Sequence, residues 1–333
     1  MATTGTTKAA AERTDGEYAG LLRTLSEGSV HRRFDPYLDI DWDGPDYRID
    51  PEDERWQLSK ESDPLGAHPW YWEQPLEKRI AIGRWRQANV SKVGLAFESI
   101  LIRGMMQYVM TLPNGSPEFR YCLHEMTEEC NHIQMFQELV NRIGVDVPGM
   151  KAPYRITSPL WSLSAYAPTL LFIGILAGEE PIDHVQKAII REGAHMPPAV
   201  LRTMEIHIAE EARHISFAHR FLQERVARQG RVAKGATSLA FPLVMRWLAG
   251  AIMAPPRDLA KEHGIPRKVM REAFWKNPKS KDIMRGFFGD VRKLAEELDL
   301  MNPASRALWR MCGIDGRVAR FRGEPDRRAR AAA

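Results

Sequence analysis

The sequence contains the pattern Glu-x-x-His twice, at Glu129–His132 and Glu211–His214, and each copy follows another glutamate at the same spacing. The preceding glutamates are Glu98 and Glu180, because 129 − 98 and 211 − 180 both equal 31. Residues three apart share one face of an α-helix, so each pattern places a carboxylate beside an imidazole. One such pair means little, whereas two pairs at the same spacing constrain the fold.

The repeated spacing has a geometric explanation if each half of the chain is a helical hairpin. From Glu98 the helix climbs about fourteen residues to the break at 113–117, and its partner descends a similar number to Glu129. Glu180 and Glu211 flank the break at 193–197 in the same way. All these side chains are therefore expected at one level of a helical bundle.

Hydrophobic periodicity predicts four long helices and no strand of any length. Ser116 can cap the second helix, Pro117 suits its first position, and Gly144 is expected to end it. The long helices are expected at about 77–112, 117–143, 158–192 and 197–229, with a long crossover between the hairpins, and shorter ones at 236–253, 267–275, 281–298 and 303–312. This connectivity predicts an all-α protein with a ferritin-like four-helix bundle core and additional C-terminal helices.

One domain is expected over residues 16–316, because the segment before the bundle and the helices after it are expected to pack against the bundle. Residues 1–15 are expected to be disordered, residues 16–78 to form an irregular wrap, and residues 317–333 to form a flexible basic tail. The tail carries much of the net charge of +4. Such charged ends are more often solvated than bound to nucleic acid, so no nucleic-acid partner is expected.

Two apolar stretches, residues 160–178 and 236–254, approach the length of a membrane span. Each contains a proline and the second carries Arg246, so both are interpreted as core helices, and no membrane partner is expected. The three cysteines have no paired spacing, and the start of the chain lacks the apolar run of a signal peptide. These features predict reduced thiols and a cytoplasmic location.

Four carboxylates and two imidazoles at one level of a dry bundle predict a site for two metal ions. The four negative charges offset the positive charges of two divalent cations. Hard oxygen donors with imidazoles suit iron or manganese, whereas a structural zinc site would favour thiolates. Glu179 competes with Glu180 as the ligand on the third helix, and the equal spacing in the two halves selects Glu180. Glu128 and Glu210, which precede the ligand glutamates, are expected to face solvent or to support the ligands.

His207 precedes Glu211 by four residues and lies on the same helix face, whereas the corresponding position of the first half is Glu125. A helix that reads His207-x-x-x-Glu211-x-x-His214, opposite the other glutamates and His132, resembles the p-aminobenzoate N-oxygenase family over about residues 79–226. The resemblance implies seven metal ligands: Glu98, Glu129, His132, Glu180, His207, Glu211 and His214. It also implies an oxygenase with two Fe ions per chain, for which Mn or Mn/Fe would use the same donors, and with O2 as co-substrate.

The family oxygenates an aromatic amine through hydroxylamine toward nitro, so the resemblance implies a small-molecule arylamine substrate. One turn before Glu98 the sequence offers Val93 and Gly94, and only Arg103 follows soon after, so the sequence gives no clear clamp for the carboxylate of an aminobenzoate. A bulkier, neutral or carrier-bound substrate therefore remains open. An external electron donor is expected, because the sequence has no GxGxxG nucleotide loop. A homodimer is compatible with such a bundle.

Three functions remain open: an amine oxygenase, a di-iron hydroxylase or desaturase that acts on C–H bonds, and a ferritin-like iron-binding protein. The Trp-rich segment 16–78 and the additional C-terminal helices argue against iron storage, since storage proteins are usually compact bundles.

Overall fold

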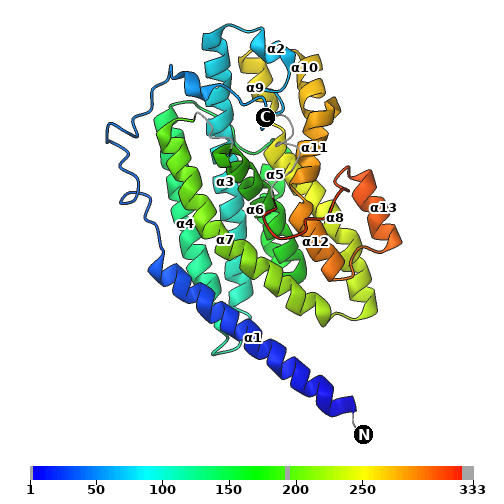
Figure 1. Ribbon diagram of the computed structural model, residues 1–333. Helices are drawn as coiled ribbons and strands as arrows, with labels where there is room; N and C mark the ends of the chain where they lie inside the picture. Colours follow the sequence, from blue (N-terminus) through cyan, green and yellow to red (C-terminus); the bar gives the residue numbers. More distant parts are fainter. Residues whose placement is uncertain (1–2, 192–195, 325–333) are drawn as a thin grey trace.

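The computed structural model describes residues 3–191 and 196–324, and these residues form helices but no β-strand. Its centre consists of α3 (Leu76–Val109), α4 (Pro117–Ile143), α6 (Pro168–Arg191) and α7 (Pro198–Ala227) (Figure 1). Helix α3 packs along α4 and α6 along α7, while contacts of α3 with α6 and of α4 with α7 join the two hairpins. The predicted all-α fold is therefore confirmed.

Two apolar clusters fill this bundle, one toward each end. On α4, Tyr121 and Met126 belong to one cluster, whereas Met135 and Leu139 belong to the other. On α7 the order is reversed, as expected for a neighbour that runs the other way, and residues 207–214 lie between the two clusters. The helix faces that carry Glu-x-x-His therefore meet in a polar layer enclosed by apolar side chains.

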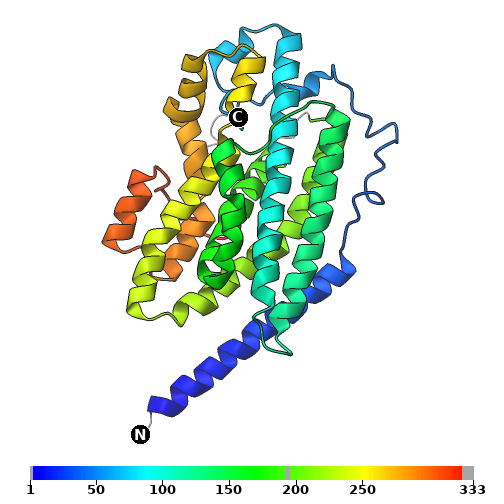
Figure 2. The ribbon, with the colours of Figure 1, turned by 180° about the vertical axis from the view of Figure 1, so that it is seen from behind.

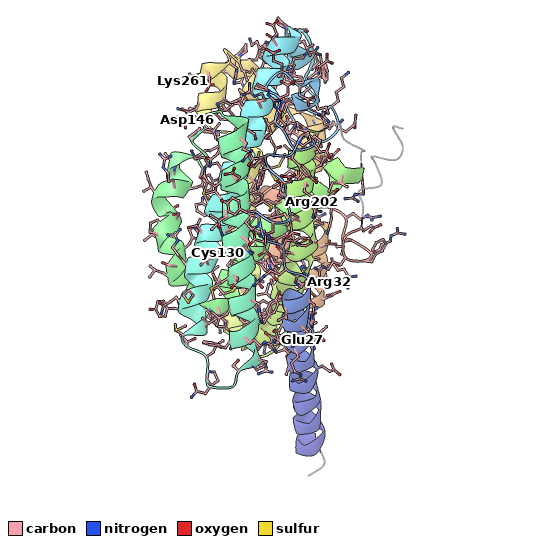
Figure 3. The ribbon with its side chains drawn as sticks, turned by 90° about the vertical axis from the view of Figure 1, so that its left-hand side faces the viewer. Glu27, Arg32, Cys130, Asp146, Arg202 and Lys261 are labelled. Atoms are coloured by element: carbon pink, nitrogen blue, oxygen red, sulfur yellow. The ribbon has the colours of Figure 1, made fainter. Side chains whose placement is uncertain are left out.

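The N-terminal region differs from the prediction. Helix α1 (Thr3–His31) covers residues 3–15 of the segment expected to be disordered and the first part of the expected wrap, while residues 1–2 lie outside the described part of the chain. Tyr18, Leu22 and Leu25 form a buried apolar stripe on α1, at the spacing of one helix face, and the helix packs on α4 and α7. Figure 3 shows α1 beside the bundle, with Glu27 and Arg32 near the end that meets the body.

The irregular wrap is shorter than expected and occupies residues 32–68. It contains a 3-10 turn, η1 (Glu54–Trp56), and leads into α2 (Pro69–Trp72). Figure 2 shows it passing outside α4 toward the opposite end of the bundle. Arg142 on α4 holds it there by donating to the carbonyl of Trp42 and to Asp43.

The crossover and the C-terminal third add further helices around the bundle. The crossover contains α5 (Ala152–Thr157) and η2 (Ser158–Tyr166), so the third long helix begins ten residues later than expected, at Pro168. The C-terminal elements are α8 (Arg231–Met253), α9 (Arg257–Glu262), α10 (Arg267–Arg271), η3 (Glu272–Lys276), α11 (Pro278–Gly286), α12 (Gly289–Glu297) and α13 (Pro303–Met311). They agree with the prediction of additional C-terminal helices.

The first part of the expected flexible tail is bonded to the body. Arg292 on α12 donates to the carbonyl of Arg317, and the backbone N–H of Gly323 donates to Asp290. Residues 317–324 therefore belong to the folded unit, and residues 325–333 lie outside the described part of the chain.

One helical stretch, Arg231–Glu262, is long and apolar enough to cross a membrane by length and composition. Its most apolar window is 61% buried inside the protein, and α8 packs along α6. This burial supports the interpretation of residues 236–254 as a core helix.

Candidate metal centre

Seven buried side chains converge in the polar layer between the two apolar clusters. They form two groups whose ligand atoms lie within 4.8 Å of one another: Glu98, His132, His207 and Glu211 in the first, and Glu129, Glu179, Glu211 and His214 in the second. Glu211 belongs to both groups and is therefore placed to bridge two ions. All four bundle helices contribute.

The two imidazoles of the Glu-x-x-His pairs are oriented alike. Nδ1 of His132 lies 3.0 Å and Nδ1 of His214 lies 2.9 Å from the carboxylate of Glu129. The Nε2 atoms point outward, His132 to Glu210 at 2.9 Å and His214 to Glu128 at 2.7 Å. If each Nε2–H donates to its outer carboxylate, both Nδ1 lone pairs face the centre, as metal ligands require.

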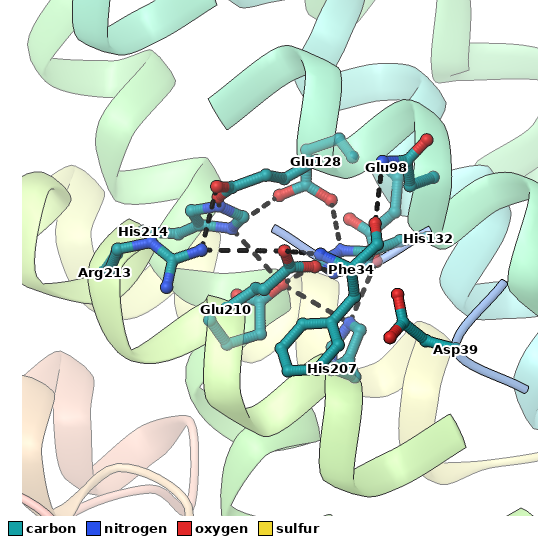
Figure 4. Close-up of polar contacts among 12 residues, drawn as sticks. Phe34, Asp39, Glu98, Glu128, His132, His207, Glu210, Arg213 and His214 are labelled. Carbon is teal, nitrogen blue, oxygen red and sulfur yellow. Dashed lines mark hydrogen bonds and ion pairs between the residues drawn. The ribbon is translucent and has the colours of Figure 1, made fainter. Parts of the chain in front are cut away.

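These outer contacts cross from one hairpin to the other. Glu128 on α4 accepts from a histidine on α7, and Glu210 on α7 accepts from a histidine on α4. Arg213 joins the pair, since its Nη2 lies 2.8 Å from Glu128 and 3.6 Å from Glu210 (Figure 4). The backbone N–H of Phe34 also donates to Glu210, so the residues after α1 close this side of the site. The expected supporting role of Glu128 and Glu210 agrees with this geometry.

His207 lies in the first group, as predicted from its position one turn before Glu211. Its Nε2 is 3.5 Å from Glu98 and 3.3 Å from Glu211, and it has no hydrogen-bond partner among the described residues. Its Nδ1 lies 2.9 Å from Oε1 of Gln186 on α6. An amide oxygen can only accept, so Nδ1 carries the proton and Nε2 is free to bind a metal. No pattern in the sequence pointed to Gln186.

On the third helix the structure brings Glu179, and not the predicted Glu180, to the other candidate ligands. Glu180 points away from the two groups and lies 2.6 Å from Nε2 of His219, whereas Glu179 lies in the second group. Adjacent residues of a helix point about 100° apart, so only one of the two can face the centre. The spacing of the candidate ligands therefore differs between the two hairpins: it is 129 − 98 = 31 residues from Glu98 to Glu129 and 211 − 179 = 32 residues from Glu179 to Glu211.

Glu125 is a further buried acid that the ligand prediction did not include. It lies on α4 one turn before Glu129, is 0% exposed, and neither of its carboxylate oxygens has a hydrogen-bond partner among the described residues. Burial raises the pKa of Glu125 to about 8. Glu125 precedes Glu129 by four residues, as His207 precedes Glu211 in the other half. This correspondence could have identified Glu125 from the sequence.

The electrostatics of the layer fit bound cations. Burial, reinforced by neighbouring carboxylates, raises the pKa of Glu98, Glu179 and Glu211. Burial also opposes the ionised form of Glu129, but the positive charges of His214 and His132 hold its pKa below the usual range. Several central atoms, among them both oxygens of Glu179 and of Glu211, have no hydrogen-bond partner among the described residues. Carboxylates that are buried, crowded and unpartnered in this way are suited to two metal ions.

A cavity of about 700 Å³ lies along α3, α6 and α7, and none of the seven converging side chains lines it. Its inner end is formed by Phe136 and Gln186, and both contact His207: the Phe136 and His207 rings lie 5.0 Å apart between centroids. A narrower pocket of about 40 Å³ touches Glu98, Glu179 and His207. The narrower pocket therefore touches the centre, whereas Phe136 and Gln186 stand between the larger cavity and His207.

Comparison with known proteins agrees with this geometry. The family model described as p-aminobenzoate N-oxygenase AurF matches residues 15–299. Uncharacterized proteins of Mycobacterium bovis and Mycobacterium tuberculosis are each 55% identical over 320 residues, which cover 96% of this chain and 94% of the relative. No solved structure matches the chain significantly.

Proposed function

We propose that this chain, which belongs to the p-aminobenzoate N-oxygenase family of di-iron proteins, uses two iron ions and O2 to oxygenate the nitrogen of a primary arylamine. The observation that carries the proposal is the placement of His207 within 3.5 Å of both Glu98 and Glu211. It adds a third imidazole to the two Glu-x-x-His pairs, which is the feature that separates this site from a generic ferritin-like one. Two iron ions held here would supply the site at which O2 is activated.

The chain's own residues have definable tasks in this proposal. His207 is a neutral nitrogen donor, because burial and then the charge of His132 hold its pKa well below the usual range. Gln186 fixes the tautomer of that ring. Phe136 packs against the rings of His207 and His132 on the side of the centre that faces the cavity. Glu125 is placed to hold a proton one turn from Glu129.

The direct test supplies the purified protein with Fe(II), a reductant, ¹⁸O2 and 4-propylaniline, and analyses the products by mass spectrometry. The proposal expects hydroxylamine and nitro products that carry ¹⁸O on nitrogen. His207→Ala is expected to retain the fold and to lower product formation by roughly 10–100-fold. The matched control is His219→Ala, since His219 contacts Glu180 outside both ligand groups. Equal losses in both variants would argue against a specific role for His207.

A second candidate is oxidation of a C–H bond by the same centre. It is favoured by the apolar wall of the cavity, where Ile182, Val185 and Met204 lie. Label on the propyl chain of the aniline, with the nitrogen unmodified, would establish this alternative and overturn N-oxygenation. Retention of iron well beyond two ions per chain, without oxidation of either group, would indicate storage.

The remaining parts of the proposal concern the source of electrons, the cellular location and the identity of the metals. We propose an external electron donor, a cytoplasmic location and iron in both positions. Elemental analysis of protein grown in unsupplemented medium distinguishes two Fe from Mn/Fe or Mn, since the donor set serves each of these metals.

A further inference from the structure

The narrow pocket between α3, α6 and η2 ends on the metal centre. Its volume is about 40 Å³, and three of the seven converging side chains line it: Glu98, Glu179 and His207. Glu98 and His207 belong to the first ligand group, whereas Glu179 belongs to the second. The pocket therefore meets ligands of both candidate ions, whereas the larger cavity meets none of the seven.

Beyond these three ligands the lining of the pocket is apolar. It includes Phe97 and Leu101 on α3 and Leu171 on α6. Among the described residues that line it, Ser164 is the one that carries a hydroxyl group, and this hydroxyl donates to the carbonyl of Trp161. A water molecule would find few hydrogen-bond partners away from the metal end, and apolar cavities of this kind stay dry and take up apolar molecules.

Two glycines on the face of α6 that lines the pocket leave this space open. A Cβ at Gly178 would lie 3.0 Å from the ring of Phe97, so the close approach of α3 accounts for this glycine. A Cβ at Gly174 would lie 3.6 Å from Trp161 and 4.0 Å from Leu248, which are ordinary contact distances. Alanine would fit there and would favour the helix. Packing therefore does not require a glycine at position 174, and what this glycine leaves is open space.

Trp161 of η2 forms the outer end of the pocket. Its ring stacks on the ring of Trp247 on α8, with 5.1 Å between the centroids and 25° between the planes. Trp161 and Gly174 are half-buried, whereas Glu98 and His207 at the inner end are buried. The pocket thus runs between α3 and α6 from half-buried residues to the candidate ligands.

The volume of the pocket decides what kind of molecule fits. A cavity must offer about 10–15 Å³ to hold one water molecule, and an apolar cavity of about 150 Å³ holds benzene. A space of about 40 Å³ therefore admits a molecule of two heavy atoms but no aromatic ring.

We propose that this pocket binds O2, as a small apolar gas, on the side of the metal centre where both ligand groups meet it. This inference rests on the proposed function for the identity of the gas, and it assigns the place at which the gas is bound. The apolar lining favours O2 over water, because O2 has no dipole and leaves water for apolar surroundings readily.

The first test locates a gas without turnover and uses xenon as the probe. Crystals of the metal-loaded protein are pressurised with xenon, without reductant or O2, and anomalous scattering shows where the gas binds. The proposal expects a xenon atom beside Phe97, Gly174 and Ile175. This result in the unaltered protein decides even if a variant does not fold.

Gly174→Ala is expected to lose the xenon site, because its methyl group takes up the space between Trp161 and Leu248. It should retain two metal ions per chain, since Gly174 belongs to neither ligand group. The matched control is Gly235→Ala on α8, because a Cβ there meets no atom within 4 Å and Gly235 does not line the pocket. This control should keep the xenon site.

The second test asks whether O2 uses the same space. Stopped-flow spectroscopy measures the second-order rate constant for the reaction of the Fe(II)-loaded protein with O2. Gly174→Ala is expected to lower this constant, and Gly235→Ala is expected to leave it unchanged. Addition of Leu248→Ala to Gly174→Ala returns space to the pocket and should restore both the xenon site and the rate constant.

Absence of xenon from this pocket in the unaltered protein, or xenon in the larger cavity alone, would overturn the proposal. An unchanged rate constant in Gly174→Ala would do the same, whether or not the xenon is lost. If the xenon and rate results are as expected but arylamines are not oxidised, the proposed N-oxygenation is overturned and the gas site stands. The two failures are therefore distinguishable.

Discussion

Glu179 and Glu180 are adjacent on α6 and both are buried, yet only Glu179 lies among the candidate ligands. Glu179→Gln is therefore expected to lower the affinity for at least one metal ion by tenfold or more, on the order of the effects known for residues around metal sites. Glu180→Gln should retain two ions per chain, since Glu180 contacts His219 instead. Metal content after dialysis against a weak chelator measures both. Loss of metal from Glu180→Gln alone would restore the assignment made from the equal spacing of the two halves.

Arg213 is the cation shared by the two outer carboxylates, Glu128 and Glu210. Arg213→Met leaves both acids buried with one partner fewer, and loss of one member of a buried ion pair costs roughly 3–5 kcal/mol. The control is Arg220→Met on the same helix, whose more exposed pair with Glu224 is worth about 1 kcal/mol or less. Urea unfolding measures both free energies. Equal losses would show that the pair of outer carboxylates does not depend on Arg213.

The sequence alone placed six of the seven converging side chains, because Glu-x-x-His and the preceding His207 are local patterns on one helix face. It could not place Glu179, because the choice between two adjacent residues depends on how the helix is rotated about its own axis and on how many residues separate the two ligands of each hairpin. Gln186 and Arg213 act across helices, and no spacing in one helix reveals such partners.

At the scale of elements, α3 and the wrap approach each other at Gly83. A Cβ at this position would overlap the backbone carbonyl of Trp56, so Gly83→Ala is expected to displace η1 and to cost roughly 1–3 kcal/mol. Gly235 in α8 is the matched control, because a Cβ there meets no atom within 4 Å. Gly235→Ala should stabilise the protein by about 0.5–1 kcal/mol, the usual gain from replacing a helical glycine. Thermal unfolding measures both, and stabilisation by Gly83→Ala would contradict this contact.

Helix boundaries were predictable where proline and glycine mark them. Both α4 and α7 begin within one residue of their predicted starts, at Pro117 and Pro198, and Gly144 ends α4 with a φ of 69°. Helix α1 was missed, because its sequence is polar apart from a narrow stripe around Leu22, and that stripe is buried only by packing on other helices. The third long helix, α6, starts later than predicted because η2 precedes it, and no local sequence pattern predicted η2.

At the scale of the whole molecule, the fold encloses a layer of acids between two apolar clusters, and this arrangement should make the metal-free protein sensitive to pH. Burial raises the pKa of Glu125 to about 8 and raises those of Glu98 and Glu179 well above the usual range. Burial opposes the charged forms of His132 and His214, but nearby carboxylates, Glu129 first, raise their pKa values. Each of these groups therefore keeps its proton in the folded protein at pH values at which the unfolded chain has already released it.

Stability contributed by such groups is complete below their unfolded pKa values and is lost as pH rises toward their folded ones. The lowered pKa values of Glu129 and His207 act in the opposite direction, but only at or below pH 6.5, where the unfolded groups titrate. Between pH 6.5 and 8 the metal-free protein should therefore lose stability. Glu125 alone accounts for roughly 2 kcal/mol of this loss, since one pH unit corresponds to about 1.4 kcal/mol.

Bound metal should reverse this trend. Cations displace the protons from the carboxylates and bind the folded state alone, so loading with Mn(II) should raise the melting temperature, and more at pH 8 than at pH 6.5. Calorimetry of chelator-treated and Mn(II)-loaded protein at both pH values measures the effect, and Glu125→Gln should reduce the slope of the metal-free protein. A metal-free protein that is as stable at pH 8 as at pH 6.5 would show that these acids are not held protonated by burial. The metal-free layer would then need a source of charge balance other than protonation of its acids.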